Sequence, residues 1–145
     1  MPIIRKSALV PYSASRMFDL VYDVGSYPQF LPWCDSASVL SETEDRICGQ
    51  IGVHRLGIRQ TFSTCNRFER DRLMHIDLLD GPFRKLVGAW RFTPLREDAS
   101  KVELELEFEF SGRLIDKAFG GVFNQIANTL VDAFCKRAEE VYGRD

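Results

Sequence analysis

Residues 114–142 read LIDKAFGGVFNQIANTLVDAFCKRAEEVY. The apolar positions recur at steps of three and four, which is the pattern of a single apolar stripe along an α-helix. Gly143 follows and is a natural stop residue for a helix. The segment after the two glycines, 122–142, would be roughly 30 Å long at about 1.5 Å per residue. So long an apolar stripe needs an equally long apolar surface to pack against, and the rest of the chain must supply it.

The chain before this helix is predicted to be mostly β-strand. After a first strand at 3–10, Ser13 is a plausible N-cap for a short helix that is closed by Gly25. A second short helix is expected at 27–31, where Ser26 and Gln29 have the spacing of a capping box. Beyond it the apolar pattern changes to a period of two. The six strands predicted from this alternation are 35–40, 46–54, 58–68, 73–79, 84–93 and 101–110.

This order of elements predicts an α+β fold. Short connections between successive strands favour an antiparallel meander. A sheet with one apolar face, curved by its twist, would wrap around the long helix. We therefore expect a helix-grip fold: a curved antiparallel sheet of about seven strands around the C-terminal helix, with two short helices after the first strand. The whole chain, 1–145, is expected to form one domain.

Composition limits the classes of function. The apolar fraction of 45% and the charged fraction of 28% are those of a soluble globular protein. The chain shows no secretory signal and no apolar run of about 20 residues, so we expect a cytoplasmic protein, with contact to the inner membrane at most peripheral. A formal charge of −2 argues against a generally basic nucleic-acid binder. The four cysteines form no metal-binding pattern with the two histidines and are expected to be reduced thiols.

Two motifs resemble those of a known family. The stretch 27–34, YPQFLPWC, follows Asp23-Val24, and GPF at 81–83 is followed by GAWRF at 88–92. Together with the final helix, these resemble the coenzyme-Q-binding branch of the START-like superfamily, which includes the bacterial ribosome association toxins. The resemblance implies a hydrophobic cavity for a lipid such as ubiquinone, no required cofactor and no catalytic apparatus. For the toxin members it implies binding to the large ribosomal subunit, which blocks the joining of subunits.

A ligand cavity is expected between the sheet and the helix. Strand parity points one set of apolar side chains inward, and the helix supplies the facing set. Within 27–34, three aromatic residues are candidates for the mouth of the cavity, although a purely structural plug is the alternative. The predicted lining consists of Tyr27, Phe30, Trp33, Phe62, Met74, Ile76, Trp90, Phe92, Leu104, Leu106, Phe108, Phe119, Phe123 and Ile126.

A quinone pocket should also contain a few polar groups. Gln60, Thr64 and Asn66 share the inward parity of the strand at 58–68, so they could supply these groups, whereas the alternative is a fully packed core. The pair Gly120-Gly121 is expected to interrupt the long helix. This interruption would serve close packing or a bend between a short lead-in helix and the main one, or else a hinge that admits a lipid. In the last case Phe119–Phe123 would be a place for transient membrane contact.

Ribosomal RNA would need cations that no neighbouring carboxylate neutralises. The strand at 101–110 carries four glutamates on its outer face, so outward cations beside it are expected to form cross-strand ion pairs. The remaining candidates for RNA contacts are Arg55, Arg59, Arg67, Arg70, Arg72 and Arg84.

Catalysis has little support in the sequence. The chain lacks the nucleophile-elbow, zinc-protease and phosphate-loop motifs. The rival from a different class is an enzyme that resembles the polyketide cyclases, which would need an acid or base inside the cavity. His54 is the one residue ambiguous enough to serve, and no metal site is expected. The preferred hypothesis is a non-enzymatic ribosome association toxin, and the alternative is a ubiquinone-binding chaperone or carrier for respiration.

Overall fold

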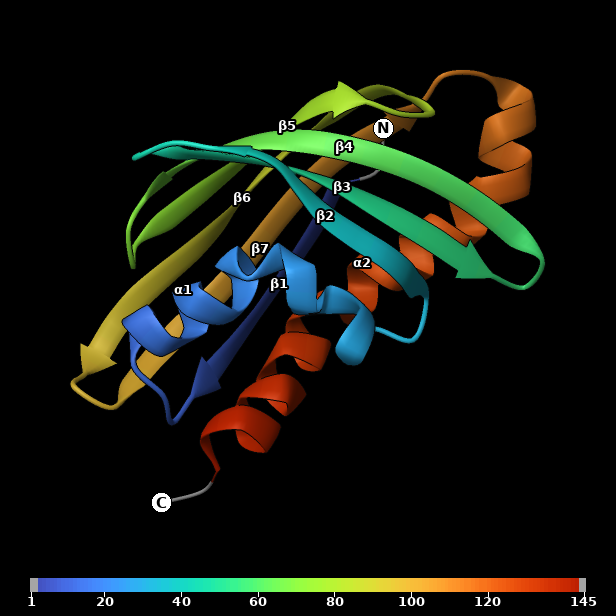
Figure 1. Cartoon of the computed structure of the whole chain (residues 1–145). Coiled ribbons are helices and arrows are strands. Elements are labelled where there is room, and N and C mark those ends of the chain that lie inside the picture. The colour runs from blue at the N-terminus through green and yellow to red at the C-terminus, as the bar shows by residue number, and fades with distance from the viewer. Residues whose placement is uncertain (1–2, 144–145) are drawn as a thin grey trace.

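The computed structural model describes residues 3–143 and has the expected helix-grip architecture. A seven-stranded antiparallel sheet arches over one long helix, and the two short helices lie on the same concave side (Figure 1). The strands are β1 (Ile3–Val10), β2 (Cys34–Glu42), β3 (Arg46–Arg55), β4 (Ile58–Glu69), β5 (Leu73–Asp80), β6 (Phe83–Arg96) and β7 (Ala99–Phe110). The helices are α1 (Ala14–Tyr22), the 3-10 helix η1 (Val24–Gln29) and α2 (Arg113–Tyr142).

The strand order in the sheet is β1-β7-β6-β5-β4-β3-β2. Strands β2 to β7 thus form a meander, and β1 completes the sheet by pairing with β7. Strand β7 follows the strict alternation of its sequence: Val102, Leu104 and Phe108 are buried, whereas the glutamates between them face outward. The alternation therefore predicted both the strand and the face that it turns to the core.

The first short helix begins as its sequence predicts, because the Ser13 hydroxyl accepts a hydrogen bond from the Arg16 amide and caps α1. The second short helix differs from the expectation. It begins at Val24 rather than at 27, and Ser26 lies inside it, where its hydroxyl donates to Asp23. The Ser26 amide donates to the Asp23 carbonyl three residues earlier, which is the pattern of a tight 3-10 turn rather than of a capped α-helix.

The long helix α2 is continuous through Gly120 and Gly121, so the expected interruption is wrong. Gly120 is buried, and a Cβ there would meet the Asp116 carboxylate at 2.5 Å and the Phe110 ring at 3.5 Å. Gly121 is exposed and faces open space. Close packing therefore explains Gly120, and the structure gives no reason for Gly121.

The rings of Phe119 and Phe123, the expected place of membrane contact, are buried and do not lie on the surface. Phe119 and Phe123 are 0% and 4% exposed, and both rings pack against Phe83 and Phe110 under the sheet. Because the helix does not break, its apolar stripe stays covered by the sheet along this segment. A bilayer could reach these rings only if α2 moved away from the sheet.

A disulfide bond joins Cys48 to Cys65. The two residues lie directly opposite each other on β3 and β4, with their Cα atoms 4.0 Å apart. The expectation of four reduced thiols is therefore wrong for this pair, because sequence spacing alone does not reveal which residues of two strands face one another. Cys34 and Cys135 are free thiols.

Loss of this disulfide should lower stability measurably. The bond closes a loop of 17 residues, for which the chain-entropy estimate is about 3 kcal/mol. We expect the double variant Cys48→Ser/Cys65→Ser to lose about that much unfolding free energy in urea under oxidising conditions. The variant Cys135→Ser, which removes a free thiol, is the matched control. If the double variant and the oxidised protein unfold at the same urea concentration, the pair does not form a stabilising bond.

Candidate functional site: an inner cavity and an outer groove

An inner cavity of about 90 Å³ lies between the concave face of the sheet and α2. Ten of the residues expected from the sequence line it, and two of these are the polar residues of β4. These ten are Tyr27, Trp33, Phe62, Thr64, Asn66, Ile76, Trp90, Leu106, Phe123 and Ile126. The central prediction, that the sheet and the helix enclose an apolar space with a few polar groups, thus has a counterpart in the structure.

Seven expected residues do not line this cavity. Five of them are packed in the surrounding core: Met74, Phe92, Leu104, Phe108 and Phe119. Phe30 lies outside the cavity in a neighbouring groove, and the half-buried Gln60 lies outside it as well. The alternation of side chains along each strand therefore predicted the inward face correctly, but it does not predict which inward side chains border the cavity.

One wall of the cavity was not expected from the sequence. Ile51 and Val53 of β3 line it, as do Ala127 and Phe134 of α2. Leu86 of β6 and Leu130 of α2 line the cavity too, as strand parity and the helix stripe predict. The signal in β3 was available, since Ile47, Ile51 and Val53 alternate with Cys48, Gln50 and Gly52. Strand β4 also shifts register against β5 between Ser63 and Thr64, a bulge of the kind that redirects side chains beside a site.

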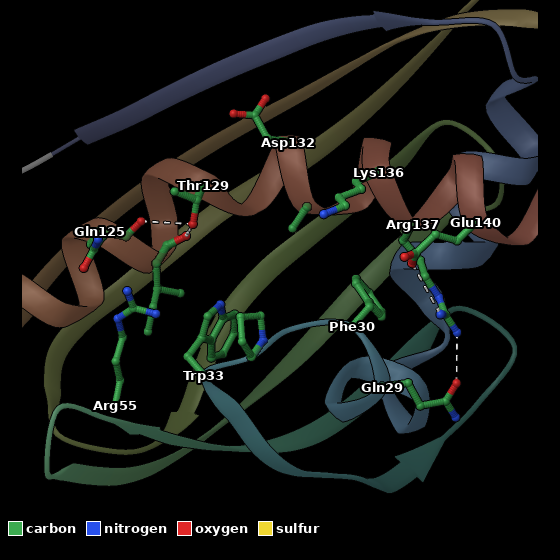
Figure 2. A pocket seen from close by; sticks show the side chains of 13 residues that line it. Gln29, Phe30, Trp33, Arg55, Gln125, Thr129, Asp132, Lys136, Arg137 and Glu140 are labelled. Carbon is green, nitrogen blue, oxygen red and sulfur yellow. Dashed lines mark hydrogen bonds and ion pairs between the residues drawn. The ribbon is translucent and has the colours of Figure 1, made fainter.

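An outer groove of about 540 Å³ adjoins the cavity, between α2, η1 and the turn from β3 to β4 (Figure 2). Its lining is amphipathic and includes Phe30, Lys136 and Arg137. Arg137 donates a hydrogen bond of 2.9 Å to Gln29, lies over the Phe30 ring at 5.0 Å and pairs with Glu140 at 3.7 Å. These contacts tie the C-terminal half of α2 to η1.

Trp33 and Ile126 line both the groove and the inner cavity. They therefore form the partition between the two spaces. Trp33 is 7% exposed and follows Pro32 in the segment that leads from η1 into β2. Movement of this indole would connect the groove with the cavity.

The cavity contains no side chain that titrates near neutral pH. Tyr27 is its one titratable lining residue among residues 3–143, and burial raises the pKa of this phenol well above its ordinary value. The Tyr27 hydroxyl donates to the Val21 carbonyl, so its proton is already engaged. Burial also raises the pKa of the nearby Cys34 thiol to about 11. Neither group is poised as an acid or base for catalysis at pH 7.

His54 does not reach this site. It is exposed, and its Nδ1 lies 3.3 Å from the guanidinium of Arg59. Within residues 3–143, no three His, Cys, Asp or Glu side chains come together as a metal site would require.

The six arginines proposed for RNA contacts do not form one cluster. Arg59 and Arg67 lie near opposite ends of β4, whose 12 residues span about 40 Å at about 3.3 Å each. Three of the six are ion-paired: Arg59 with Asp35 at 2.9 Å, Arg70 with Asp19 at 3.6 Å and Arg84 with Glu109 at 2.9 Å. Arg55 lines the outer groove.

Arg67 and Arg72 are exposed, and neither has an ion pair within residues 3–143. Arg46, which was not among the expected RNA contacts, lies directly opposite Arg67 on β3 and is exposed too. Like charges in facing positions repel each other. Neither arginine of this pair is neutralised by a carboxylate within residues 3–143, so the outer sheet face carries two unpaired positive charges here. By contrast, Arg5 pairs with Glu105 and Lys85 pairs with Glu107. Both are cross-strand ion pairs with β7, of the kind expected from the sequence.

Comparison with known proteins assigns the family. Residues 10–135 match the model described as "Polyketide cyclase / dehydrase and lipid transport". The chain belongs to this START-like family. It is 47% identical to the ribosome association toxin RatA of Escherichia coli K12, over 98% of this chain and 90% of the relative. A toxin of Escherichia coli O6:H1, named for persistence and stress resistance and called PasT, is 48% identical with the same coverage.

A mitochondrial relative is more distant. It is the coenzyme Q-binding protein COQ10 homolog B of Xenopus laevis, 30% identical over 96% of this chain and 59% of its own. Among solved structures, the Zhui aromatase/cyclase of a Streptomyces species superposes with a TM-score of 0.83, at 16% identity, covering 95% of this chain and 93% of that one. At that identity the likeness establishes the fold alone. An 18 kDa protein of Caulobacter crescentus is 30% identical, with a TM-score of 0.75 over 99% of this chain and 100% of its own.

No helix within residues 3–143 has an apolar stretch that could cross a membrane.

Proposed function

We propose that this START-like protein is a non-catalytic factor that binds the large ribosomal subunit and interferes with the joining of subunits. The observation that carries the proposal is the likeness to RatA, at 47% identity along 98% of the chain. Tyr27, the titratable residue that lines the cavity within residues 3–143, has a pKa raised by burial and a proton engaged by the Val21 carbonyl, which favours a role in binding over one in chemistry.

Several cations have no carboxylate partner within residues 3–143. Among them we choose Arg46, Arg67 and Arg72 for ribosomal RNA, because Arg46 and Arg67 lie directly opposite each other and Arg72 follows in the exposed turn after β4. Arg70 is a poorer candidate. Besides its pair with Asp19, its guanidinium lies 5.1 to 5.8 Å from the ring centroids of Phe18, Tyr22 and Phe68, so it holds α1 against β4. A test of RNA binding should therefore leave Arg70 in place.

We expect binding to isolated large subunits to weaken as salt is added, because each neutralised phosphate releases counterions. The triple variant Arg46→Gln/Arg67→Gln/Arg72→Gln should flatten the slope of log affinity against log salt by about two to three units. Co-sedimentation with large subunits over a range of salt concentrations measures this slope.

The matched control is Arg5→Gln/Arg84→Gln, which removes two exposed cations that already pair with Glu105 and Glu109. This variant should keep the slope of the natural protein. If the natural protein does not bind large subunits at low salt, the ribosomal role is refuted. If the triple variant keeps the slope of the natural protein, these three arginines do not form the contact, which then lies elsewhere on the surface.

A second function is favoured by the inner cavity. We propose that the protein also carries an apolar molecule such as ubiquinone, working beside the inner membrane without crossing it. The support is the aromatic lining of the cavity, the amphipathic groove next to it and the likeness to a coenzyme Q-binding protein.

Mass spectrometry of an organic extract of the purified protein tests the carrier role. We expect an isoprenoid quinone or another lipid to copurify, and the variant Ala127→Leu to lose it, because Ala127 is fully buried and lines the cavity. Ala118→Leu, on an exposed position of the same helix, should retain it. Extracts without any lipid, or equal amounts from both variants, would contradict the carrier role while leaving the ribosomal proposal intact.

A further inference from the structure

Besides the indole N–H donors of Trp33 and Trp90, two side chains that line the inner cavity within residues 3–143 could hydrogen-bond to an occupant. Its other lining side chains are apolar or aromatic, apart from Tyr27, whose hydroxyl already donates to the Val21 carbonyl. Thr64 and Asn66 both lie on β4, two residues apart and therefore on the same face of the strand. They form a single polar spot on an otherwise apolar wall.

The Asn66 amide has its two ends in different situations. Its Nδ2 donates a weak hydrogen bond to the sulfur of Met74, at 3.6 Å. Its Oδ1 is buried and has no hydrogen-bond donor within residues 3–143. Exchanging the two ends would place the oxygen against the sulfur, and because both atoms are acceptors, the contact at Met74 favours the orientation described.

A buried acceptor without a donor is unusual in a folded protein, because it has lost its hydrogen bonds to water and gained none in return. Asn66 lines the cavity, and its Oδ1 is covered there until the lining side chains shift. A molecule in this cavity with an O–H group could supply the missing donor, whereas one with only a carbonyl group could not. The Thr64 hydroxyl, which both donates and accepts, could serve as the second partner of the same group.

We propose that the inner cavity selects an aromatic molecule that bears a hydroxyl group, with its O–H donating to Asn66 Oδ1. The occupant is thus a phenol, a class that includes the reduced, hydroquinone form of a quinone, in preference to the carbonyl form. The ring is favoured by the aromatic lining, in which Trp90 and Phe134 already meet edge to face at 5.3 Å. This inference rests on the carrier function proposed above and specifies the chemistry of its ligand.

Binding requires the cavity to widen. Its volume of about 90 Å³ is below the roughly 150 Å³ of an apolar cavity that holds benzene. Three lining side chains, Ile51, Phe62 and Leu130, are only partly buried and can shift. The outer groove also lies directly behind Trp33 and offers the adjoining space.

Phenol and toluene are the probes that test the preference, because they have nearly the same size and differ in one hydroxyl. Their dissociation constants are measured by NMR titration of the natural protein and of Asn66→Leu, which keeps the volume and removes the acceptor. We expect the ratio of toluene to phenol affinity to rise about tenfold in Asn66→Leu, which corresponds to about 1.4 kcal/mol. The control Gln60→Leu, on the same strand but outside the cavity, should keep the ratio of the natural protein.

A second readout needs no variant and so holds even if Asn66→Leu fails to fold. In the natural protein, both probes should shift the indole signal of Trp90, but phenol should shift the side-chain amide signals of Asn66 more than toluene does, because only phenol adds a hydrogen bond to the effect of the ring. An unchanged affinity ratio in a folded Asn66→Leu protein, or equal Asn66 shifts with both probes, would overturn the preference and leave the carrier function standing. If neither probe binds saturably, both the preference and the cavity as a ligand site are refuted.

Discussion

The contact between the apolar stripe of α2 and the concave face of the sheet is the constraint on which the rest of the structure depends. Phe123 packs against Phe83 and Phe108 at ring distances of 4.9 and 4.8 Å. About three turns further on, Phe134 packs against Trp90 of the sheet and Tyr27 of η1. Aromatic pairs of this kind add about 0.5 to 1.5 kcal/mol each beyond their buried area. The helix is thus fixed at both ends of its buried segment, and η1 is fixed with it.

The same packing explains why a space remains between these two groups of rings. The sheet must curve to follow a helix of 30 residues, and Gly88 lies where β6 and β7 come too close for a side chain. The sheet and the helix do not stay in contact along their whole length, so side chains must fill the gap between them. Between Phe123 and Phe134 the facing helix residues are Ile126, Ala127 and Leu130, and the small Ala127 leaves the gap unfilled.

Much of the fold could be predicted from the sequence because it depends on periodicity. The alternation in β7 and the stripe of α2 each involve many residues, so single exceptions do not obscure them. The details that were wrong depend on register or on local geometry instead. The Cys48–Cys65 bond and the facing pair Arg46 and Arg67 follow from the pairing of β3 with β4, which periodicity does not determine.

The candidate site was predictable only in part for the same reason. Parity placed Thr64 and Asn66 on the inner face, and both line the cavity. It placed Gln60 there too, but Gln60 lies four residues closer to the end of the strand, beyond the enclosed space. The six arginines expected to contact RNA do not form one unpaired cluster. Whether an arginine is ion-paired depends on which carboxylates lie nearby, and Asp35 lies beside Arg59.

Xenon pressurisation of crystals of the natural protein tests the central claim most directly, namely that the sheet and α2 enclose an unfilled apolar space. Xenon enters such cavities without needing a specific polar contact, so it reports on the space alone. The structure predicts one xenon site bounded by Trp90 of β6, Ile126 and Ala127 of α2 and the polar pair of β4. Well-diffracting crystals with no xenon between the sheet and α2 would contradict it, and the core would then be fully packed.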